Sequence, residues 1–557
     1  MDLSGAKPRK LETQSILDAG SAPNALLAQL AAVLRDGLGD RTHAVTLLQP
    51  SQPSRSAVSE SPVQSMLPAT LHIGLIYDTA HSSRLVDHGP AADDSDPSKA
   101  AQFRDFWGDK AELRRFKDGR IVESVVWDVK DEGERAAVPV AVVEHLLARH
   151  FGVGVEGGGV MTWGKEWDAI VRVPEAVARV HQGEKGVAGG FKGAMASFDA
   201  LVKALKALDD DLPLSLVSIS PASPYLRYTS AFAPLPLSER LAGALPVCWG
   251  YLAPMEIVLE FEKSARWPDE LRAVQKIKMA FCERVAEALM GAVDGLRASV
   301  VVGAVGHGMV GKEGIQDEVR LEIITRDGWA FSARIWHDRE AMLLDRIVEP
   351  KPKALQKPED LSGEKRQEAL DAKELYLRLF AHAPRHHRAI ASLCHRFPSF
   401  AGTVRLVKRW LAAHWLLHGC VSEEAVELLC AAVFVRDGKL PVEGDETASP
   451  AGVPGSKERG FTCVVEFLAE WRWEDGVAVP LSGGQVSNPK TIVTSNGKRG
   501  VWRISTEDDE AGRIWTASGP DLMAAHRIRA ITKATYGHMN GIQNGGFNVK
   551  VSLPPGL

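Results

Sequence analysis

The chain has 557 residues, of which 45% are hydrophobic and 25% are charged, and its formal net charge is -5. This composition is ordinary for globular protein and gives no overall attraction to nucleic acid, so any RNA contact must come from local basic patches. The length predicts about three or four domains, and no apolar run approaches the roughly 18 residues of a membrane span. We therefore expect an intracellular multidomain protein without membrane contact.

An α/β block is predicted for residues 1–155. Two strands in this block are separated by the Ser- and Pro-rich stretch QPSQPSRSAVSESPVQS, which is typical of a surface loop. The predicted elements, in chain order, are a helix over 21–35, strands over 41–48 and 71–78, a helix over 100–108, a strand over 123–129 and a helix over 139–151.

Basic and aromatic side chains crowd together in the middle of this block. The basic residues are Lys110, Arg114, Arg115, Lys117 and Arg120, and the aromatic residues near them are Phe106, Trp107 and Phe116. Phosphate pairing and base stacking make this combination suitable for RNA. The alternative is a surface helix or hairpin whose charge is balanced by Asp109, Glu112 and Asp118. The sequence leaves both interpretations open.

A second block combines a sheet with helices. Strands are predicted over 212–220, 255–262, 298–305, 318–326 and 330–338, with helices over 196–209 and 267–291. The strand PMEIVLEFE places Glu256, Glu260 and Glu262 on one side and apolar residues on the other. Such a row of acids is either part of a magnesium site or the polar outer face of a half-buried strand.

A third block, after the polar linker at 349–367, is almost wholly helical up to residue 473. Strands are then predicted over 490–495 and 500–505, followed by a helix near 520–537. One helix carries Arg405, Lys408 and Arg409 on a shared face, where they could bind an RNA backbone or an acidic partner, with Trp410 turned inward. The histidines His382, His386 and His387 surround Pro384, which we expect to break the helix, so they are predicted to be surface or RNA-facing residues.

The order of these blocks resembles the poly(A) polymerase and oligoadenylate synthetase superfamily. In that superfamily a basic and aromatic helix, here RLVKRW, and a helix opened by serine, here VSEEAVELL, lie over the nucleotide. Longer phrases are similar to the Nrap family of nucleolar RNA-associated proteins, which belong to the small-subunit processome: FRDFWGDKAELRRFKDGRIVESVVW, SPASPYLRYTSAFAP, FEKSARWPDELRAVQKIKMAFCERVAE and HRFPSFAGTVRLVKRWLAAHWL.

The resemblance implies two tandem nucleotidyltransferase-like modules in the family, of which this chain carries the second. It implies a third family domain over 1–155, a nucleotidyltransferase-like domain over 156–350, and a helical PAP/OAS1-like domain with C-terminal strands over 351–540. Residues 541–557 are then a tail, and the first module and the final family domain have no counterpart in this sequence.

Catalysis by a nucleotidyltransferase needs a Gly-Ser turn for the triphosphate, two acids one residue apart, and a third acid on a neighbouring strand. At the turn this chain has Ser220 and Ser223 among prolines, which donate no N–H to a phosphate. Glu256 can occupy the first acid position, but Val258 occupies the second and Arg334 lies at the third. We therefore predict a pseudoenzyme with no catalytic residues, no bound metal and no cofactor. The six scattered cysteines likewise predict neither zinc nor disulfides.

The resemblance further implies the pathway in which the protein works. We expect a noncatalytic RNA-binding and protein-binding scaffold in the nucleolus, which acts in pre-rRNA processing and small ribosomal subunit assembly. Its expected partners are pre-rRNA, small nucleolar RNA and other proteins of the small-subunit processome. The alternatives are an active RNA nucleotidyltransferase and a pure protein-interaction module.

Overall fold

The computed structural model describes residues 22–48, 71–116, 119–129, 132–153, 164–180, 190–209, 211–237, 254–264, 267–303, 319–349, 363–435, 453–482, 484, 486–487 and 500–545. The chain divides into two compact units. Unit 1 comprises Met1–Ile170, Phe397–Thr403 and Glu443–Cys463, and unit 2 comprises Val171–Arg396, Val404–Val442 and Val464–Leu557. No helix among the described residues is both long and apolar enough to cross a bilayer.

Unit 1 opens with two helices packed together beside an antiparallel strand pair. These elements are α2 (Ala22–Leu38), β1 (Thr42–Leu48), β2 (His72–Tyr77) and α4 (Val138–Phe151). The α2 leucines recur every fourth position, so Leu30, Leu34 and Leu38 lie on one face and are buried against Leu146 of α4 and its neighbours. Gly37 allows this approach, since a Cβ there would overlap the Leu146 side chain.

The second sheet of unit 1 has three antiparallel strands in the order β3, β5, β4. Their bounds are β3 (Val86–Ala91), β4 (Ala111–Arg115) and β5 (Ile121–Val126), and helix α3 (Pro97–Trp107) packs beside them. Asp96 caps α3 by accepting a hydrogen bond from the Ser98 N–H, and Pro97 occupies the first turn. The sequence predicted β5 and α3 but neither β3 nor β4. Of the basic cluster, Arg114 and Arg115 therefore lie on the edge strand β4, Lys110 lies just before it, and Arg120 lies between β4 and β5 in what we call the β4–β5 hairpin.

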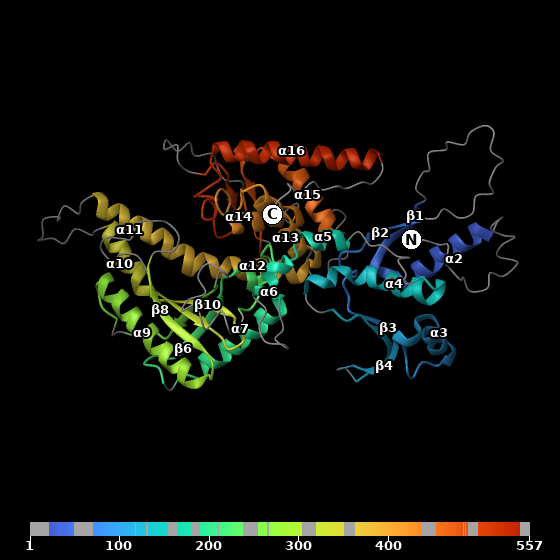
Figure 1. Cartoon of the computed structure of the whole chain (residues 1–557), viewed down its shortest axis with the longest axis horizontal. Coiled ribbons are helices and arrows are strands. Elements are labelled where there is room, and N and C mark those ends of the chain that lie inside the picture. The colour runs from blue at the N-terminus through green and yellow to red at the C-terminus, as the bar shows by residue number, and fades with distance from the viewer. Residues whose placement is uncertain are drawn as a thin grey trace, which may run out of the picture. The chain divides into compact units, whose positions relative to one another are not determined.

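Unit 2 is built around a five-stranded mixed sheet (Figure 1). Its strands, in spatial order, are β6 (Leu216–Pro221), β7 (Met255–Phe261), β10 (Ala330–Trp336), β9 (Val319–Ile324) and β8 (Arg297–Val302). Strands β7 and β10 are parallel, and every other neighbouring pair is antiparallel. All five strands were predicted from the sequence. Strand β7 carries Glu256 and Glu260, the acids for which the sequence left two interpretations open.

Apolar residues cover both faces of this sheet. On one face, Met255, Ile257 and Leu259 of β7 join a core with helices α7 (Gly190–Lys206) and α9 (Leu271–Ala292). On the other face, Val258 joins a second core with helices α10 (Asp338–Val348) and α11 (Gly363–Tyr376). The side of β7 that carries Glu256 and Glu260 is therefore not fully exposed to solvent, because Val258 between them is buried in this second core.

A helical part follows α11. Its elements are the π-helix η5 (Leu377–His382), α12 (Ala383–Arg396), α13 (Pro398–Ala413), α14 (Glu423–Phe434), α15 (Lys457–Glu470) and α16 (Leu522–Gly545), with a short parallel strand pair, β11 (Val477–Ala478) and β12 (Ile504–Ser505). The start of α13, up to Thr403, and the start of α15, up to Cys463, count with unit 1, and the rest counts with unit 2. The strand predicted over 490–495 lies outside the described residues, and the one predicted over 500–505 is reduced to two residues.

The expectation that Pro384 breaks the helix is wrong. Pro384 lies in the first turn of α12, where a missing N–H is tolerated, and the wide π-turn of η5 leads directly into it. As a result His386 and His387 are both 5% exposed, and their prediction as surface residues is also wrong.

Candidate functional site

The acids of β7 do not form a continuous row. Glu256 and Glu262 are exposed, Glu260 is half-buried and accepts a hydrogen bond of 2.8 Å from the Ser218 hydroxyl, and Val258 is buried. The position between the first two acids thus belongs to an apolar core. An ion that needs two carboxylates one residue apart finds only Glu256 here.

Arg334 replaces an acid at the position that faces Val258. In the parallel register of β7 and β10, Arg334 lies directly beside Val258. Loss of hydration, with the charge of Glu424, raises the pKa of the Glu256 carboxyl, although the group keeps contact with solvent, and the charges of Arg334, Arg378 and Arg227 partly oppose this rise. The Arg334 guanidinium thus brings positive charge to a place where magnesium would need negative charge.

One further acid shares this side of the sheet, but it is already engaged. Glu322 of β9 lies opposite Ser332, which in turn lies opposite Glu256, so the three residues form one cross-strand row. The Glu322 carboxylate is buried and accepts a hydrogen bond of 2.9 Å from Arg320. Across the part of the chain that the structure describes, no three His, Cys, Asp or Glu side chains gather in a set able to hold a metal ion.

The turn after β6 is closed on itself. The Ser223 hydroxyl is buried and accepts the N–H of Tyr225 at 3.3 Å, which caps the short helix η4 (Pro224–Arg227). The N–H of Ala222 donates to the Glu256 carbonyl at 2.9 Å, while Ser220 lies half-buried in β6 opposite Val258. The Ala222 N–H and the Ser223 hydroxyl oxygen are thus used within the protein, and Pro224 has no N–H.

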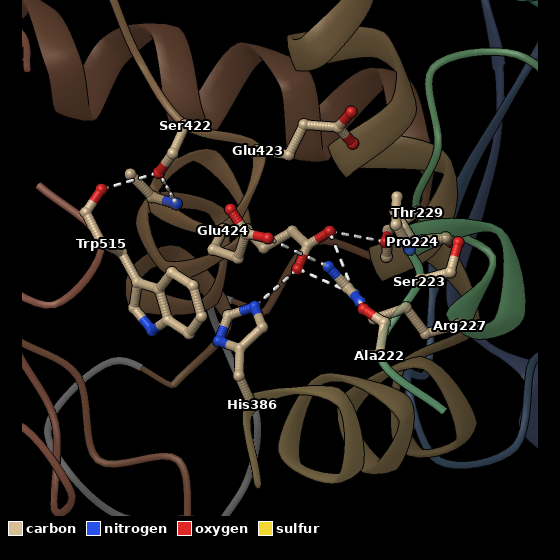
Figure 2. Close-up of polar contacts among 12 residues, drawn as sticks. Ala222, Ser223, Pro224, Arg227, Thr229, His386, Ser422, Glu423, Glu424 and Trp515 are labelled. Carbon is tan, nitrogen blue, oxygen red and sulfur yellow. Dashed lines mark hydrogen bonds and ion pairs between the residues drawn. The ribbon is translucent and has the colours of Figure 1, made fainter. Parts of the chain in front are cut away.

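A buried ion cluster around Glu427 lies next to this turn, and we call it the Glu427 cluster (Figure 2). Its members come from the turn after β6 and from helices α12, α13 and α14: Arg227, Thr229, His386, Lys408, Glu423 and Glu427. Glu427 binds Arg227 Nε at 3.0 Å and Lys408 Nζ at 2.6 Å, and all three side chains are at most 1% exposed. These contacts fasten the sheet to the helical part of unit 2.

Every oxygen of the Glu427 carboxylate has more than one partner. Oε1 also accepts from the Thr229 hydroxyl at 2.6 Å, and Oε2 lies 2.7 Å from His386 Nε2. Figure 2 shows the Arg227 guanidinium and the His386 ring approaching a common point from opposite sides. Burial alone would raise the pKa of Glu427, but Arg227, Lys408 and His386 outweigh it and hold that pKa well below its ordinary value.

His387 lies beside the cluster and makes the fold sensitive to acid. Burial, reinforced by the charge of Arg227, lowers the pKa of His387 to about 3. In the unfolded chain the ordinary value is near 6.5. Between these values the unfolded state binds the extra proton, so stability rises with pH across this window and is lost on acidification.

Lowering the pH from about 7 to about 5 should therefore reduce the free energy of unfolding by about 2 kcal/mol through His387 alone. Urea unfolding of the parent and of His387→Gln at both pH values measures this term as a difference between the two proteins. A variant that loses as much stability as the parent over this pH range would show that His387 does not titrate as described.

The basic residues of α13 that were predicted to bind RNA differ in their exposure to solvent. Lys408 is fully buried and bound to Glu423 at 2.7 Å as well as to Glu427, so the prediction that it contacts RNA is wrong. Arg405 and Arg409 are half-buried, with guanidinium carbons 4.9 Å and 5.1 Å from the ring centres of Phe191 and Phe232. Trp410, predicted to turn inward, is half-buried and meets His414 edge to face.

The basic residues that were predicted to bind RNA near the β4–β5 hairpin are largely exposed. Arg114, Arg115 and Arg120 are exposed, and Arg114 forms a surface ion pair of 2.7 Å with Glu112. Lys110 is half-buried, with its ammonium 5.6 Å from the Trp127 ring centre. Lys117 lies outside the described residues. The hairpin residues belong to unit 1 and the α13 residues around the cluster belong to unit 2.

Sequence reasoning missed Arg227, His386 and Glu427 as the residues that organise the site. A signal for Glu427 was present, because it is a single acid inside the apolar run AVELLCAAVF. A carboxylate on such a buried helix requires a cationic partner. The partner could not be identified from sequence, since Arg227 lies two hundred positions away.

Three family models match consecutive parts of the chain. They are Nrap protein domain 3 over residues 3–152, Nrap protein nucleotidyltransferase domain 4 over residues 167–395, and Nrap protein PAP/OAS1-like domain 5 over residues 397–551. The smaller α/β domain, the nucleotidyltransferase-like sheet domain and the PAP/OAS1-like helical domain therefore follow one another, as predicted.

Curated relatives agree with these matches. U3 small nucleolar RNA-associated protein 22 of Schizosaccharomyces pombe is 30% identical over 87% of this chain and 40% of the relative. Nucleolar protein 6 of Mus musculus is 28% identical over 91% of this chain and 41% of the relative. The chain thus spans about two fifths of the length of these relatives.

Among solved structures, the Cid1 poly(U) polymerase bound to magnesium and 3'-dATP matches with a TM-score of 0.34 and 12% identity, over 71% of this chain and 98% of that one. The three domain matches, in family order and over nearly the whole length, show that the chain belongs to the Nrap family.

Proposed function

We propose that this chain is a noncatalytic scaffold that binds RNA and proteins during nucleolar assembly of the small ribosomal subunit. The pathway is proposed from the relatives, whose names place them in the nucleolus and with the U3 small nucleolar RNA. The proposed partners are pre-rRNA, small nucleolar RNA and proteins of the small-subunit processome.

The observation that carries the noncatalytic part is the pair formed by Val258 and Arg334. These residues lie side by side at the level where a nucleotidyltransferase needs carboxylates, and one is apolar while the other is cationic. The Glu427 cluster supports the same proposal, because Lys408 is used for internal ion pairs. A phosphate could reach Lys408 only by breaking buried contacts.

The RNA-binding part is supported by the β4–β5 hairpin. Arg114, Arg115 and Arg120 present three guanidinium groups on an exposed edge, together with the exposed apolar side chains of Leu113 and Ile121. Glu112 neutralises little of this charge, since exposed ion pairs contribute weakly and exchange readily for a phosphate. The Arg114 and Arg115 cations are therefore accessible to an RNA backbone.

Changing Arg114 and Arg115 together to Gln should weaken binding to many RNAs almost equally at low salt. Each lost phosphate contact should reduce the slope of log affinity against log salt by roughly 0.7 to 0.9, so the double variant should lose about 1.4 to 1.8. The affinity difference from the parent should shrink as salt rises. Fluorescence anisotropy with a labelled RNA at several salt concentrations measures both quantities.

A matched control removes the same charge elsewhere in unit 1. Arg35→Gln with Lys99→Gln changes two exposed cations outside the hairpin and should leave the slope close to that of the parent. Equal slopes for the parent and the hairpin variant, with unchanged melting temperature, would remove the hairpin from the RNA surface. If the parent bound no RNA at all, a pure protein-interaction module would replace the RNA-binding proposal.

A further inference from the structure

Trp415 lies in the loop between α13 and α14 and is 79% exposed, more than any other large hydrophobic side chain among the described residues. Its backbone has φ of 60°, in the left-handed region that bulky residues rarely adopt. An exposed indole on a strained backbone contributes little to the stability of the fold. Its presence needs a reason outside the folded core.

The loop holds Trp415 rigidly in this place. The N–H of Leu416 donates to the Leu411 carbonyl at 3.0 Å, and the N–H of Trp415 donates to the Ala412 carbonyl at 3.0 Å. This pair of bonds is the Schellman motif, in which the left-handed position is usually glycine. Leu411 and Leu416 are buried, which completes the motif. Trp415 thus occupies a glycine position and points a large aromatic side chain into solvent.

Helix α16 adds positive charge beside this loop. Arg527 donates a hydrogen bond of 3.1 Å to the carbonyl of His414, the residue before Trp415. The 24 residues of α16 include no Asp or Glu, and His526, Arg527 and Lys533 are exposed on it. The preceding acid, Asp521, is used to cap the helix through the Ala524 N–H at 2.7 Å. The surface next to Trp415 therefore complements phosphate.

We infer that Trp415 is a stacking platform for an unpaired RNA base, with the adjoining phosphate bound by Arg527. An aromatic face beside cations is the arrangement that binds single-stranded nucleic acid, because every base has a face to stack and the backbone carries the charge. Bases inside a duplex are already stacked and cannot reach the indole. The inference rests on the proposed RNA-binding function but uses residues of unit 2 and none of the β4–β5 hairpin.

The test compares the full chain with Trp415→Gly and Trp415→Phe on a labelled single-stranded RNA of about 12 nucleotides and on the matching duplex. Loss of one stacked base should weaken single-strand binding by roughly 5- to 150-fold in Trp415→Gly. Trp415→Phe should keep most of the affinity, and duplex binding should not change. The melting temperature of Trp415→Gly should equal or exceed that of the parent, because glycine is unstrained there.

Three results would overturn the inference. Unchanged single-strand affinity in Trp415→Gly would leave the indole to another kind of partner, and an equal loss on both RNAs would exclude base stacking. A lower melting temperature in both Trp415→Gly and Trp415→Asn, whose side chain tolerates the left-handed conformation, would assign the indole to the fold. If the hairpin variant Arg114→Gln with Arg115→Gln loses RNA while Trp415→Gly keeps it, RNA binding stands and only this site fails. If the parent binds no RNA, both proposals fail.

Discussion

Replacing Glu427 with Gln should lower the free energy of unfolding by about 3 to 5 kcal/mol, the usual cost of breaking a buried ion pair from one side. The change keeps the size of the side chain but removes the charge that Arg227 and Lys408 share. Among the described residues, Glu423 and Glu424, which are partly exposed, would then be left to balance these two buried cations. Urea unfolding followed by circular dichroism measures the loss.

Glu424→Gln is the matched control. Glu424 follows Glu423 in the first turn of α14 and lies 4.0 Å from Arg227, but its side chain is 27% exposed and has access to water. Its loss should cost no more than about 1 kcal/mol. Equal losses of unfolding free energy in the two variants would show that burial of Glu427 does not determine its contribution to stability.

Lys408 and Glu427 should also prove strongly coupled to each other. Lys408→Met leaves part of the Glu427 charge unpaired, and Glu427→Gln deprives Lys408 of this partner. In the double variant both charges are gone, so neither is left buried without the other. The double variant should therefore be about 0.5 to 3 kcal/mol more stable than the sum of the two single losses predicts. A double-mutant cycle of unfolding free energies gives this coupling energy.

The exposed pair of Arg385 and Asp508 provides the comparison for this cycle. Its atoms are 3.0 Å apart, and both side chains are 53% exposed. Removing its charges singly and together should give a coupling below about 1 kcal/mol, because water screens the pair. Coupling no larger in the buried pair than in this exposed pair would contradict the description of the Glu427 cluster.

The sheet of unit 2 was predictable because its strands alternate or form short apolar runs between turn residues. The strands β3 and β4 were not, since VDHGPA and AELRR contain few apolar residues and gain their order from pairing with β5. Strand pairing of this kind depends on partners distant in sequence. The helix of His386 was missed for a related reason, because Pro384 is tolerated only at the start of a helix whose preceding turn is known.

The candidate site was predictable only in part. The substitutions at Val258 and Arg334 could be read from strand periodicity, and the observed register of β7 and β10 places them side by side. The burial of Lys408 could not be predicted, because helical spacing placed it on a face with Arg405 and Arg409 but did not reveal what covers that face. Its carboxylate partners were not recognised because α14 follows α13 only after a loop.

The most direct test of the noncatalytic proposal is a primer-extension experiment with the full chain. Purified protein is mixed with magnesium or manganese, each nucleoside triphosphate and an RNA primer, and products are compared with a protein-free reaction. The incomplete acid set, with Glu256 beside Val258 and Arg334, predicts no extension. Extension that is lost when Glu256 is changed to Gln would contradict the proposal and assign catalysis to this face of the sheet.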